Sequence, residues 1–259
     1  MPNNRREGDF WSKLRRFTQA QIGLGSSGPA FPTSYLLKFQ LAHAIAKDSV
    51  HHRWNAEQFR KSLKKVGLKN LTSLTLASQV KDRMNYLARP DLGRKLDSAS
   101  LKTIKRALKP KKTPIDITFI VSNGLSTLSI DQHGLPLLSK LTKRIVREGW
   151  TISPVFLVPN ARVAISDQIG EQTKSRIALI IIGERPGLSS CDSLAIYLTF
   201  GPKLGNTDAN RNCISNIRPP DGLSYHLAIE KCVYLIRESL RLGYSGVMLK
   251  DGTDHQRLT

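Results

Sequence analysis

The chain has 259 residues, 40% of them hydrophobic, which is enough for one large domain or two small ones around a buried core. No window holds eighteen consecutive apolar residues, so a transmembrane helix is excluded, and the first residues lack the apolar stretch of a secretory signal. The three cysteines, Cys191, Cys213 and Cys232, are odd in number and lack C-x-x-C spacing. They indicate reduced thiols in the cytoplasm rather than a disulfide framework or a zinc site.

The charge balance is strongly basic, because 40 Lys and Arg against 20 Asp and Glu give a formal net charge of +20. Such an excess favours a polyanionic partner, so a basic nucleic-acid-binding module is the alternative function. The basic residues recur in every segment, however, and neither a recognition helix nor a basic motif with interleaved aromatic residues accompanies them. An acidic partner subunit would explain the charge equally well.

The first part of the chain is predicted to be an arm followed by helices. Residues 1–30 are basic and rich in Gly and Ser, which indicates an extended N-terminal arm or a partly ordered lead-in. Residues 31–112 are predicted to form a mostly helical region, because apolar residues recur there with helical spacing. The predicted elements are a helix after Pro32 with Leu37, Leu41 and Ile45 on one face, a helix from Asn55 to Gly67 with Phe59, Leu63 and Val66 inward, a short strand within 71–76 and a helix over about 92–108.

The character of the sequence changes after Lys109–Pro114, where two prolines among lysines predict a domain boundary. In the second domain, residues 113–259, β-branched runs alternate with helical stripes, which predicts a three-layer α/β domain with a mainly parallel sheet. Lys140, Lys143, Arg144 and Arg147 lie opposite the inner stripe of one helix and are expected to face solvent. The predicted strands cover 115–121, 151–158, 177–182, 194–200 and 247–249, and the predicted helices begin near Pro136 and at Ser224, the second ending at Gly243.

Ligands of such sheets bind beyond the carboxyl ends of the strands, where the connecting loops converge. The turn Gly183–Gly187 is the most informative of these loops, because it follows the most hydrophobic strand and its glycines permit positive φ and close backbone approach. A tight strand exit with Glu184 and Arg185 merely solvated is the simpler alternative. The loops that this rule selects are 122–124, about 160–167, 183–188 and 211–216.

Two near-matches to ligand-binding motifs fail on their context. Gly23–Gly28 fits G-x-G-x-x-G and is the sole support for a stand-alone nucleotide-dependent enzyme, but no apolar strand precedes it and prolines follow it. Asp131–Pro136 nearly fits the D-x-H-x-x-G pattern with which one class of cobalamin proteins presents a histidine to cobalt, but Pro136 replaces the final glycine. We therefore reject His133 as a cobalt ligand and interpret it as a surface histidine close to a helix start.

No catalytic constellation is found in the sequence. The G-x-S-x-G, P-loop and H-E-x-x-H patterns are missing, and the six histidines do not form a metal-binding spacing. The adjacent His51 and His52 are interpreted as a helix end. An α/β domain without its own acid, base or nucleophile set indicates a binding subunit of a larger enzyme, with no catalytic and no metal-ligating residue on this chain.

Seven short stretches that span roughly residues 14–250 carry a family resemblance. They are 14–18, 39–44, 89–94, 123–126, 167–171, 182–188, which holds Gly-Glu-Arg-Pro-Gly, and 213–216, which reads Cys-Ile-Ser-Asn. In this order they resemble the small subunit, or light chain, of ethanolamine ammonia-lyase.

The resemblance implies a hetero-oligomeric, adenosylcobalamin-dependent lyase that converts ethanolamine to acetaldehyde and ammonia. In that family a large TIM-barrel subunit binds substrate and carries the radical chemistry. The small subunit contains a Rossmann-like domain, here residues 113–259, which closes over the cobalamin at the subunit interface. A cytoplasmic location, in some hosts within a bacterial microcompartment, is a further family implication.

By the same resemblance, cofactor contacts fall on Val163, Glu184 and Cys213, each in a loop that the strand-end rule selects. Glu184 can accept hydrogen bonds from amide or hydroxyl donors, and Val163 and Cys213 offer backbone groups and apolar side chains. Cys213 has a simpler interpretation as a small buried hydrophobic residue. The chain departs from the family at Ser26 and Ser27, where relatives often have an arginine, and the family does not require the +20 charge.

Overall fold

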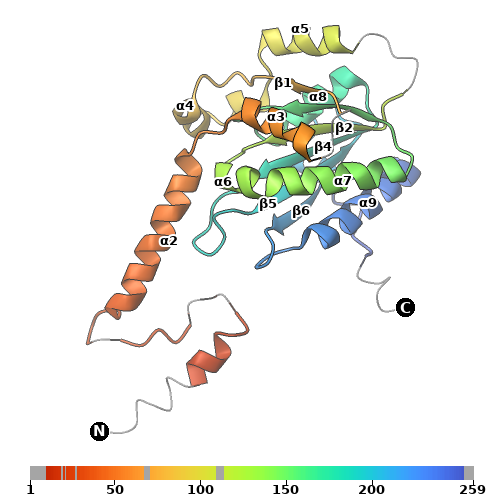
Figure 1. Ribbon diagram of the computed structural model, residues 1–259. Helices are drawn as coiled ribbons and strands as arrows, with labels where there is room; N and C mark the ends of the chain where they lie inside the picture. Colours follow the sequence, from red (N-terminus) through yellow and green to blue (C-terminus); the bar gives the residue numbers. More distant parts are fainter. Residues whose placement is uncertain are drawn as a thin grey trace.

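A computed structural model describes residues 10–18, 20, 22–26, 28–66, 71–108 and 114–253 of the chain (Figure 1). The predicted helix end at Gly67 and most of the predicted boundary at Lys109–Pro114 lie outside these residues. Among the described helices, none combines the length and apolar character that crossing a membrane requires.

A six-stranded sheet in the order β1-β3-β2-β4-β5-β6 forms the centre of the molecule. Strands β1, β3, β2 and β4 run parallel to one another, whereas β5 is antiparallel to both β4 and β6, so β6 points the same way as β4. The predicted α/β class is confirmed, and the sheet is mixed, with β5 reversed. The strands are β1 (Ser73–Thr75), β2 (Ile117–Ser122), β3 (Ile152–Leu157), β4 (Ile177–Gly183), β5 (Leu194–Phe200) and β6 (Arg211–Ile217).

Strand β1 belongs to the predicted N-terminal region 31–112, yet it pairs with β3 of the region 113–259. The two predicted regions therefore contribute to one sheet, and their division into domains stays a prediction.

Two predictions for the last third of the chain are wrong. Residues 211–216, predicted to be a loop, form most of β6, and their polar character reflects an edge strand on which Cys213 and Ser215 are exposed. Residues 247–249, predicted to be a strand, form a turn. The Asn212 amide donates to the carbonyls of Gly246 (3.1 Å) and Leu249 (2.9 Å), so these carbonyls bind a side chain instead of a neighbouring strand.

The helices begin largely where capping side chains predict. Asn55 accepts a hydrogen bond from the Gln58 N–H (2.9 Å), and α9 ends at Gly243, which has a φ of 81°. The helices are α2 (Thr33–His51), α3 (Ala56–Lys65), α4 (Arg83–Ala88), η1 (Leu92–Arg94), α5 (Ser98–Ala107), α6 (Thr127–Ser129), η2 (Ile130–Gly134), α7 (Leu135–Arg147), α8 (Ile165–Thr173), η3 (Asp208–Asn210) and α9 (Tyr225–Leu242).

Two helical predictions need correction. The single helix predicted over about 92–108 is broken into η1 and α5, because the Asp97 carboxylate caps a new helix by accepting from the Ser100 N–H (2.7 Å). Helix α8 begins within the stretch 160–167 that was predicted to be a loop. The helix predicted near Pro136 is confirmed as α7, and α2 ends at His51 as expected.

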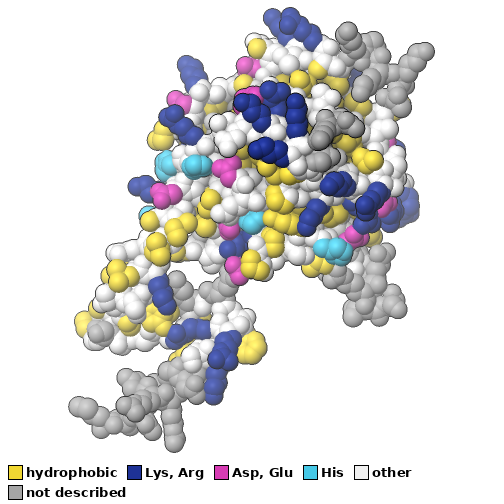
Figure 2. Space-filling view, in the orientation of Figure 1, with side chains coloured by type: hydrophobic (Ala, Val, Ile, Leu, Met, Phe, Trp, Pro, Cys, Tyr) yellow, Lys and Arg dark blue, Asp and Glu magenta, His cyan; other side chains and the backbone are white. Residues whose placement is uncertain are grey.

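Three of the four basic side chains predicted to face solvent on α7, Lys140, Lys143 and Arg147, are exposed. Arg144 is only partly exposed, because its guanidinium pairs with Glu148 (2.9 Å) and with Glu230. In Figure 2 the Lys and Arg side chains form several separate groups on the visible face rather than one continuous stripe.

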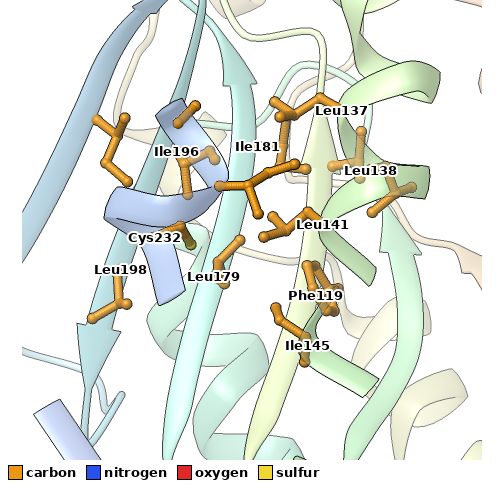
Figure 3. Packing of buried hydrophobic residues seen from close by; sticks show 14 of the residues in the cluster. Phe119, Leu137, Leu138, Leu141, Ile145, Leu179, Ile181, Ile196, Leu198 and Cys232 are labelled. Carbon is orange, nitrogen blue, oxygen red and sulfur yellow. The ribbon is translucent and has the colours of Figure 1, made fainter. Parts of the chain in front are cut away.

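Helices cover both faces of the sheet, which confirms the predicted three layers. Buried residues of α3, α7 and α9 form one cluster with one face of the sheet, and those of α5 and α8 form another with the opposite face. Figure 3 shows Leu138 and Leu141 of α7 directed toward Ile181 of β4. Every residue of β4 is buried, and each buried isoleucine contributes about 1.5–3 kcal/mol to folding.

Candidate functional site

The loops after the parallel strands β2, β3 and β4 meet at one edge of the sheet, as the strand-end rule predicts, whereas the reversed strand β5 ends at the opposite edge. At this edge the β2 loop and the exit of β4 interlock, since the Leu125 N–H donates to the Gly183 carbonyl (3.1 Å). A Cβ atom on Gly183 would lie 2.1 Å from the Ser126 carbonyl oxygen and 2.4 Å from that of Asn123. Gly183 is not among the glycines with positive φ, so the close approach of two backbones is what requires a glycine here.

The other glycine of the predicted turn is far less restricted. Gly187 also lacks a positive φ, and the nearest neighbour of an added Cβ would be the Ser190 hydroxyl at 3.1 Å. The turn 183–187 therefore depends on Gly183 alone for its approach to the β2 loop.

A pocket with a volume of about 280 Å³ opens at this edge. Two of the three predicted cofactor contacts, Val163 and Glu184, line it together. The full lining is Tyr86, Gly124, Leu125, Arg162, Val163, Ile182, Gly183, Glu184, Arg185 and Tyr197.

Glu184 is half-buried, and its carboxylate is held against β6. One oxygen accepts from the Ser215 hydroxyl, and the other accepts from the Asn216 N–H (3.0 Å). The β5–β6 register shifts at this point, and Asn216 has a φ of 58°, which turns its N–H out of the ladder. The simpler alternative of a merely solvated Glu184 is therefore wrong, because the side chain joins the exit of β4 to β6.

Val163 lies in the loop between β3 and α8, and its partly buried side chain packs on the second core cluster with Tyr197. The loop is positioned by the β2 exit: the Asn160 N–H donates to the Asn123 amide oxygen (2.8 Å), and the Ala161 N–H donates to the Ser122 hydroxyl (3.1 Å). These bonds explain how a residue far from Glu184 in sequence reaches the same pocket.

Cys213 lies in the middle of β6, directly opposite Tyr197 of β5, and is exposed. It lines a neighbouring hollow of about 380 Å³ rather than the pocket of Val163 and Glu184. Its interpretation as a buried hydrophobic residue is wrong, because its side chain is exposed on this edge strand. Desolvation raises the pKa of the Cys213 thiol, the Glu184 carboxylate raises it further, and a hydrogen bond with Tyr197 opposes the rise.

Tyr197 connects the three predicted residues. Its side chain lines the pocket with Val163 and Glu184 and hydrogen-bonds with Cys213 on the neighbouring strand. Desolvation and the nearby Cys213 and Glu184 raise the pKa of the Tyr197 hydroxyl, so it stays protonated at neutral pH. Sequence reasoning missed Tyr197, although it breaks the apolar run of β5 as the one hydroxyl-bearing aromatic residue there.

Tyr86 and Arg162 form another wall of the pocket that the sequence did not indicate. The Tyr86 side chain is 1% exposed, and its hydroxyl donates to the Ala161 carbonyl (3.1 Å). The Arg162 guanidinium lies over the Tyr86 ring, 4.2 Å from its centroid, and the Arg162 N–H donates to the Gly93 carbonyl (2.8 Å). The stretch 89–94 is thereby brought to the pocket through its backbone.

Arg83 ties the pocket loops to the end of α2. Its guanidinium donates to the carbonyls of Val50 (2.7 Å), Gly124 (2.6 Å) and Leu125 (3.0 Å), and to the Asn160 amide oxygen (3.0 Å). One side chain thus fixes the β2 loop, the β3 loop and α2 relative to one another.

His133 is buried, so its interpretation as a surface histidine is wrong. It is 8% exposed, with Nδ1 2.7 Å from the Tyr225 hydroxyl and Nε2 3.4 Å from an Asp192 oxygen. The Arg218 Nε donates to the other Asp192 oxygen (2.8 Å). Through these contacts His133 links η2 to the start of α9 and to the loop after β4.

Comparison with known proteins supports a family assignment. The sequence model of the family described as ethanolamine ammonia-lyase light chain (EutC) matches residues 8–250. The ethanolamine ammonia-lyase small subunits of Pseudomonas paraeruginosa and Azotobacter vinelandii are each 46% identical over 248 residues, which cover 96% of this chain and 89% and 90% of those proteins. That of Pseudomonas putida strain W619 is 45% identical over 241 residues, 93% of this chain and 87% of that protein. The chain belongs to the ethanolamine ammonia-lyase small subunit (light chain) family.

Proposed function

We propose that this chain holds adenosylcobalamin against a large subunit, and that the complex converts ethanolamine to acetaldehyde and ammonia. The observation that carries the proposal is the convergence of Val163 and Glu184 in one pocket, with Tyr197 joining them to Cys213. These four residues lie on four different strands or loops, and the resemblance implies a cofactor role for three of them.

The chemistry of this pocket fits the edge of a corrinoid. Such a ring is bordered by amide groups, which donate hydrogen bonds, and has apolar faces. Each carboxylate oxygen has two acceptor sites, so Glu184 keeps acceptor capacity beyond its bonds to Ser215 and Asn216. Val163 and the ring of Tyr197 supply apolar contact surface beside this acceptor.

The size of the pocket supports a shared site. Pockets that enclose a drug-sized ligand have volumes of about 300–1,000 Å³, and a cobalamin is larger than such a ligand. A pocket of about 280 Å³ can therefore cover only part of the cofactor. The remaining surface would be covered by the large subunit, in agreement with a subunit that has no activity alone.

When bound, adenosylcobalamin supplies the radical for the reaction. The residues of this chain would orient the cofactor and exclude water from one side of it. Glu184 would accept hydrogen bonds at the rim, while Val163 and Cys213 would contact the cofactor through backbone and apolar groups. We assign no catalytic residue to this chain.

The comparisons do not support the alternative of a nucleic-acid-binding module. The dispersed basic groups in Figure 2 also lack the continuous stripe that such a module requires. An acidic surface on the large subunit remains our proposal for the partner of the +20 charge.

The test is co-expression with the large subunit, followed by an assay of adenosylcobalamin-dependent acetaldehyde release. We expect a stable complex that is active only when both subunits are present. A complex that forms but neither binds cobalamin nor turns over would reject the proposal.

The role of Glu184 is tested in the same complex. We expect Glu184→Ala to weaken cobalamin binding by about tenfold, the effect of losing one or two hydrogen bonds to a charged acceptor. Glu171→Ala, which removes an exposed carboxylate from α8, is the matched control and should leave the affinity unchanged. Equal affinities for Glu184→Ala and the wild type would remove Glu184 from the site.

A further inference from the structure

Helix α2 projects from the body of the molecule and leaves its apolar side chains uncovered (Figure 1). Leu36 is 47% exposed, Phe39 43% and Leu41 62%. Leu37 and Ile45, which were predicted to share one face with Leu41, are 60% and 39% exposed, so that face does not turn toward the core. The projecting region carries several hydrophobic side chains in Figure 2.

The apolar side chains of α2 surround the helix. Successive residues of an α-helix are rotated by about 100°, so Leu36, Phe39 and Leu41 point in directions separated by roughly 60°, 160° and 140°. Only Lys38, Lys47 and Asp48 carry a formal charge among the 19 residues of α2, with its histidines neutral. A helix that is apolar on all sides is normally enclosed, whereas a helix with one apolar stripe packs against a single neighbour.

The surface area of α2 distinguishes two ways of covering it, enclosure in a partner's groove and pairing with α2 of a second copy. A cylinder of about 28 Å by about 10 Å, the size of such a helix, has a side surface of about 900 Å². Stable interfaces bury about 800 Å² on each partner, which enclosure of α2 would supply. Pairing with α2 of a second copy would cover about one third of the circumference, or roughly 300 Å², too little for a stable dimer.

The base of α2 is fixed beside the candidate cofactor pocket. Ser49 is buried, and its hydroxyl lies 2.7 Å from that of Ser126 and donates to the Cys191 carbonyl (2.9 Å). Ser126 directly follows Gly124 and Leu125, which line the pocket. A partner that encloses α2 is therefore brought to the edge at which the pocket opens.

We propose that α2 inserts into a concave, mainly apolar groove of the large subunit and thereby seats that subunit over the pocket. This inference rests on the proposed function, which names the large subunit as the partner. A one-sided contact would leave most of the apolar surface of α2 in water, and a second copy would bury too little of it.

The experiment compares two single substitutions on opposite sides of α2, Phe39→Gln and Leu41→Gln. Glutamine favours helices and adds no charge, so a loss of binding would report on burial rather than on helix formation or electrostatics. Met248→Gln is the matched control, because Met248 is 76% exposed in the turn after α9. Affinity for the purified large subunit is measured by calorimetry, and the helix content of each variant by circular dichroism.

We expect Phe39→Gln and Leu41→Gln each to weaken binding by about tenfold or more, and Met248→Gln to change it less than about twofold. Wild-type affinity for both α2 variants would overturn the inference while leaving the proposed function intact. A loss at only one of the two positions would overturn enclosure in favour of a one-sided contact.

Two further outcomes separate the inference from the proposed function. If the wild-type chain does not bind the large subunit at all, both fail. If the isolated chain sediments as a dimer that Leu41→Gln dissociates, and large-subunit binding is unaffected, the occupant is a second copy and the inference is wrong.

Discussion

The guanidinium of Arg211 and the carboxylate of Asp167 lie 2.7 Å apart, and their side chains are only 2% and 3% exposed. Arg211 is the first residue of β6, and Asp167 lies in the first turn of α8. This ion pair therefore joins the edge strand to a helix from which β4 and β5 separate it in the chain. The Thr199 hydroxyl and the Asn206 carbonyl accept hydrogen bonds from further N–H groups of the Arg211 guanidinium. The pair holds α8 against β6 on the face of the sheet where Val163 and Tyr197 pack.

Breaking this pair should be costly. Arg211→Met leaves the Asp167 carboxylate buried without a cation, and we expect a loss of about 3–5 kcal/mol in the free energy of unfolding measured with urea. Adding Asp167→Leu to Arg211→Met should recover much of that loss, because no buried charge remains. If Arg211→Met alone were as stable as the wild type, the burial of the pair would be contradicted. The exposed pair Arg241–Glu238 provides the control, and Arg241→Met should change little.

The two glycines of the turn 183–187 should respond differently to alanine. A Cβ on Gly183 would meet two backbone carbonyl oxygens at 2.1 and 2.4 Å, and neither can move without disturbing the β2 loop. We expect Gly183→Ala to destabilise the fold by about 1–3 kcal/mol or more, as overpacking does. Gly187→Ala should be close to neutral, because only the mobile Ser190 hydroxyl is near. Thermal unfolding of both variants checks this, and equal melting temperatures would contradict it.

The ion pair of Asp192 should appear in the acid stability of the protein. Burial opposes ionisation of Asp192, but hydrogen bonds from Arg218 and His133 hold the pKa of this carboxyl below its ordinary value. The unfolded chain then binds more protons than the folded one near that value. The stabilisation is therefore present above about pH 4 and is lost as the pH falls below it.

Urea unfolding at a series of pH values between 2 and 7 measures this contribution. We expect Asp192→Asn to be less stable than the wild type at pH 7 and to lose less stability on acidification. Arg218→Met should reduce the loss of stability on acidification in the same way, since it removes the guanidinium that contributes most to lowering the Asp192 pKa. Parallel pH profiles for the wild type and both variants would refute the assignment.

The thiol of Cys213 should be exposed but weakly reactive at neutral pH. Desolvation and the Glu184 carboxylate raise its pKa, so the thiolate fraction is small below the ordinary thiol pKa of about 8.5. In a Cys191→Ser background, we expect the rate of iodoacetamide labelling to rise only above that pH. Glu184→Gln should shift the rise toward lower pH because it removes a nearby negative charge. An unshifted profile would show that the two groups do not interact.

Several elements could be predicted from the sequence because their signals are local. The β-branched runs of β2 and β4, the Asn55 cap of α3 and the Gly243 end of α9 each depend on a few neighbouring residues. The loops after β2 and β4 were also found this way, since the carboxyl edge of a sheet is implied once the strands alternate with helices. Polar β6 and the interrupted helix at Asp97 were missed, because an edge strand lacks apolar alternation and one cap can divide a helical pattern.

The sequence by itself determined the α/β class, most helices and strands, and the family resemblance, because periodicity, caps and motifs are properties of short segments. Only the tertiary structure decided that β5 is reversed, that His133 is buried and that Tyr86 and Tyr197 share a pocket with Val163 and Glu184. It also decided that α2, an unremarkable helix in the sequence, lies outside the core. Strand direction, burial and shared walls depend on which distant segments meet, and that is set by the packing of the whole chain.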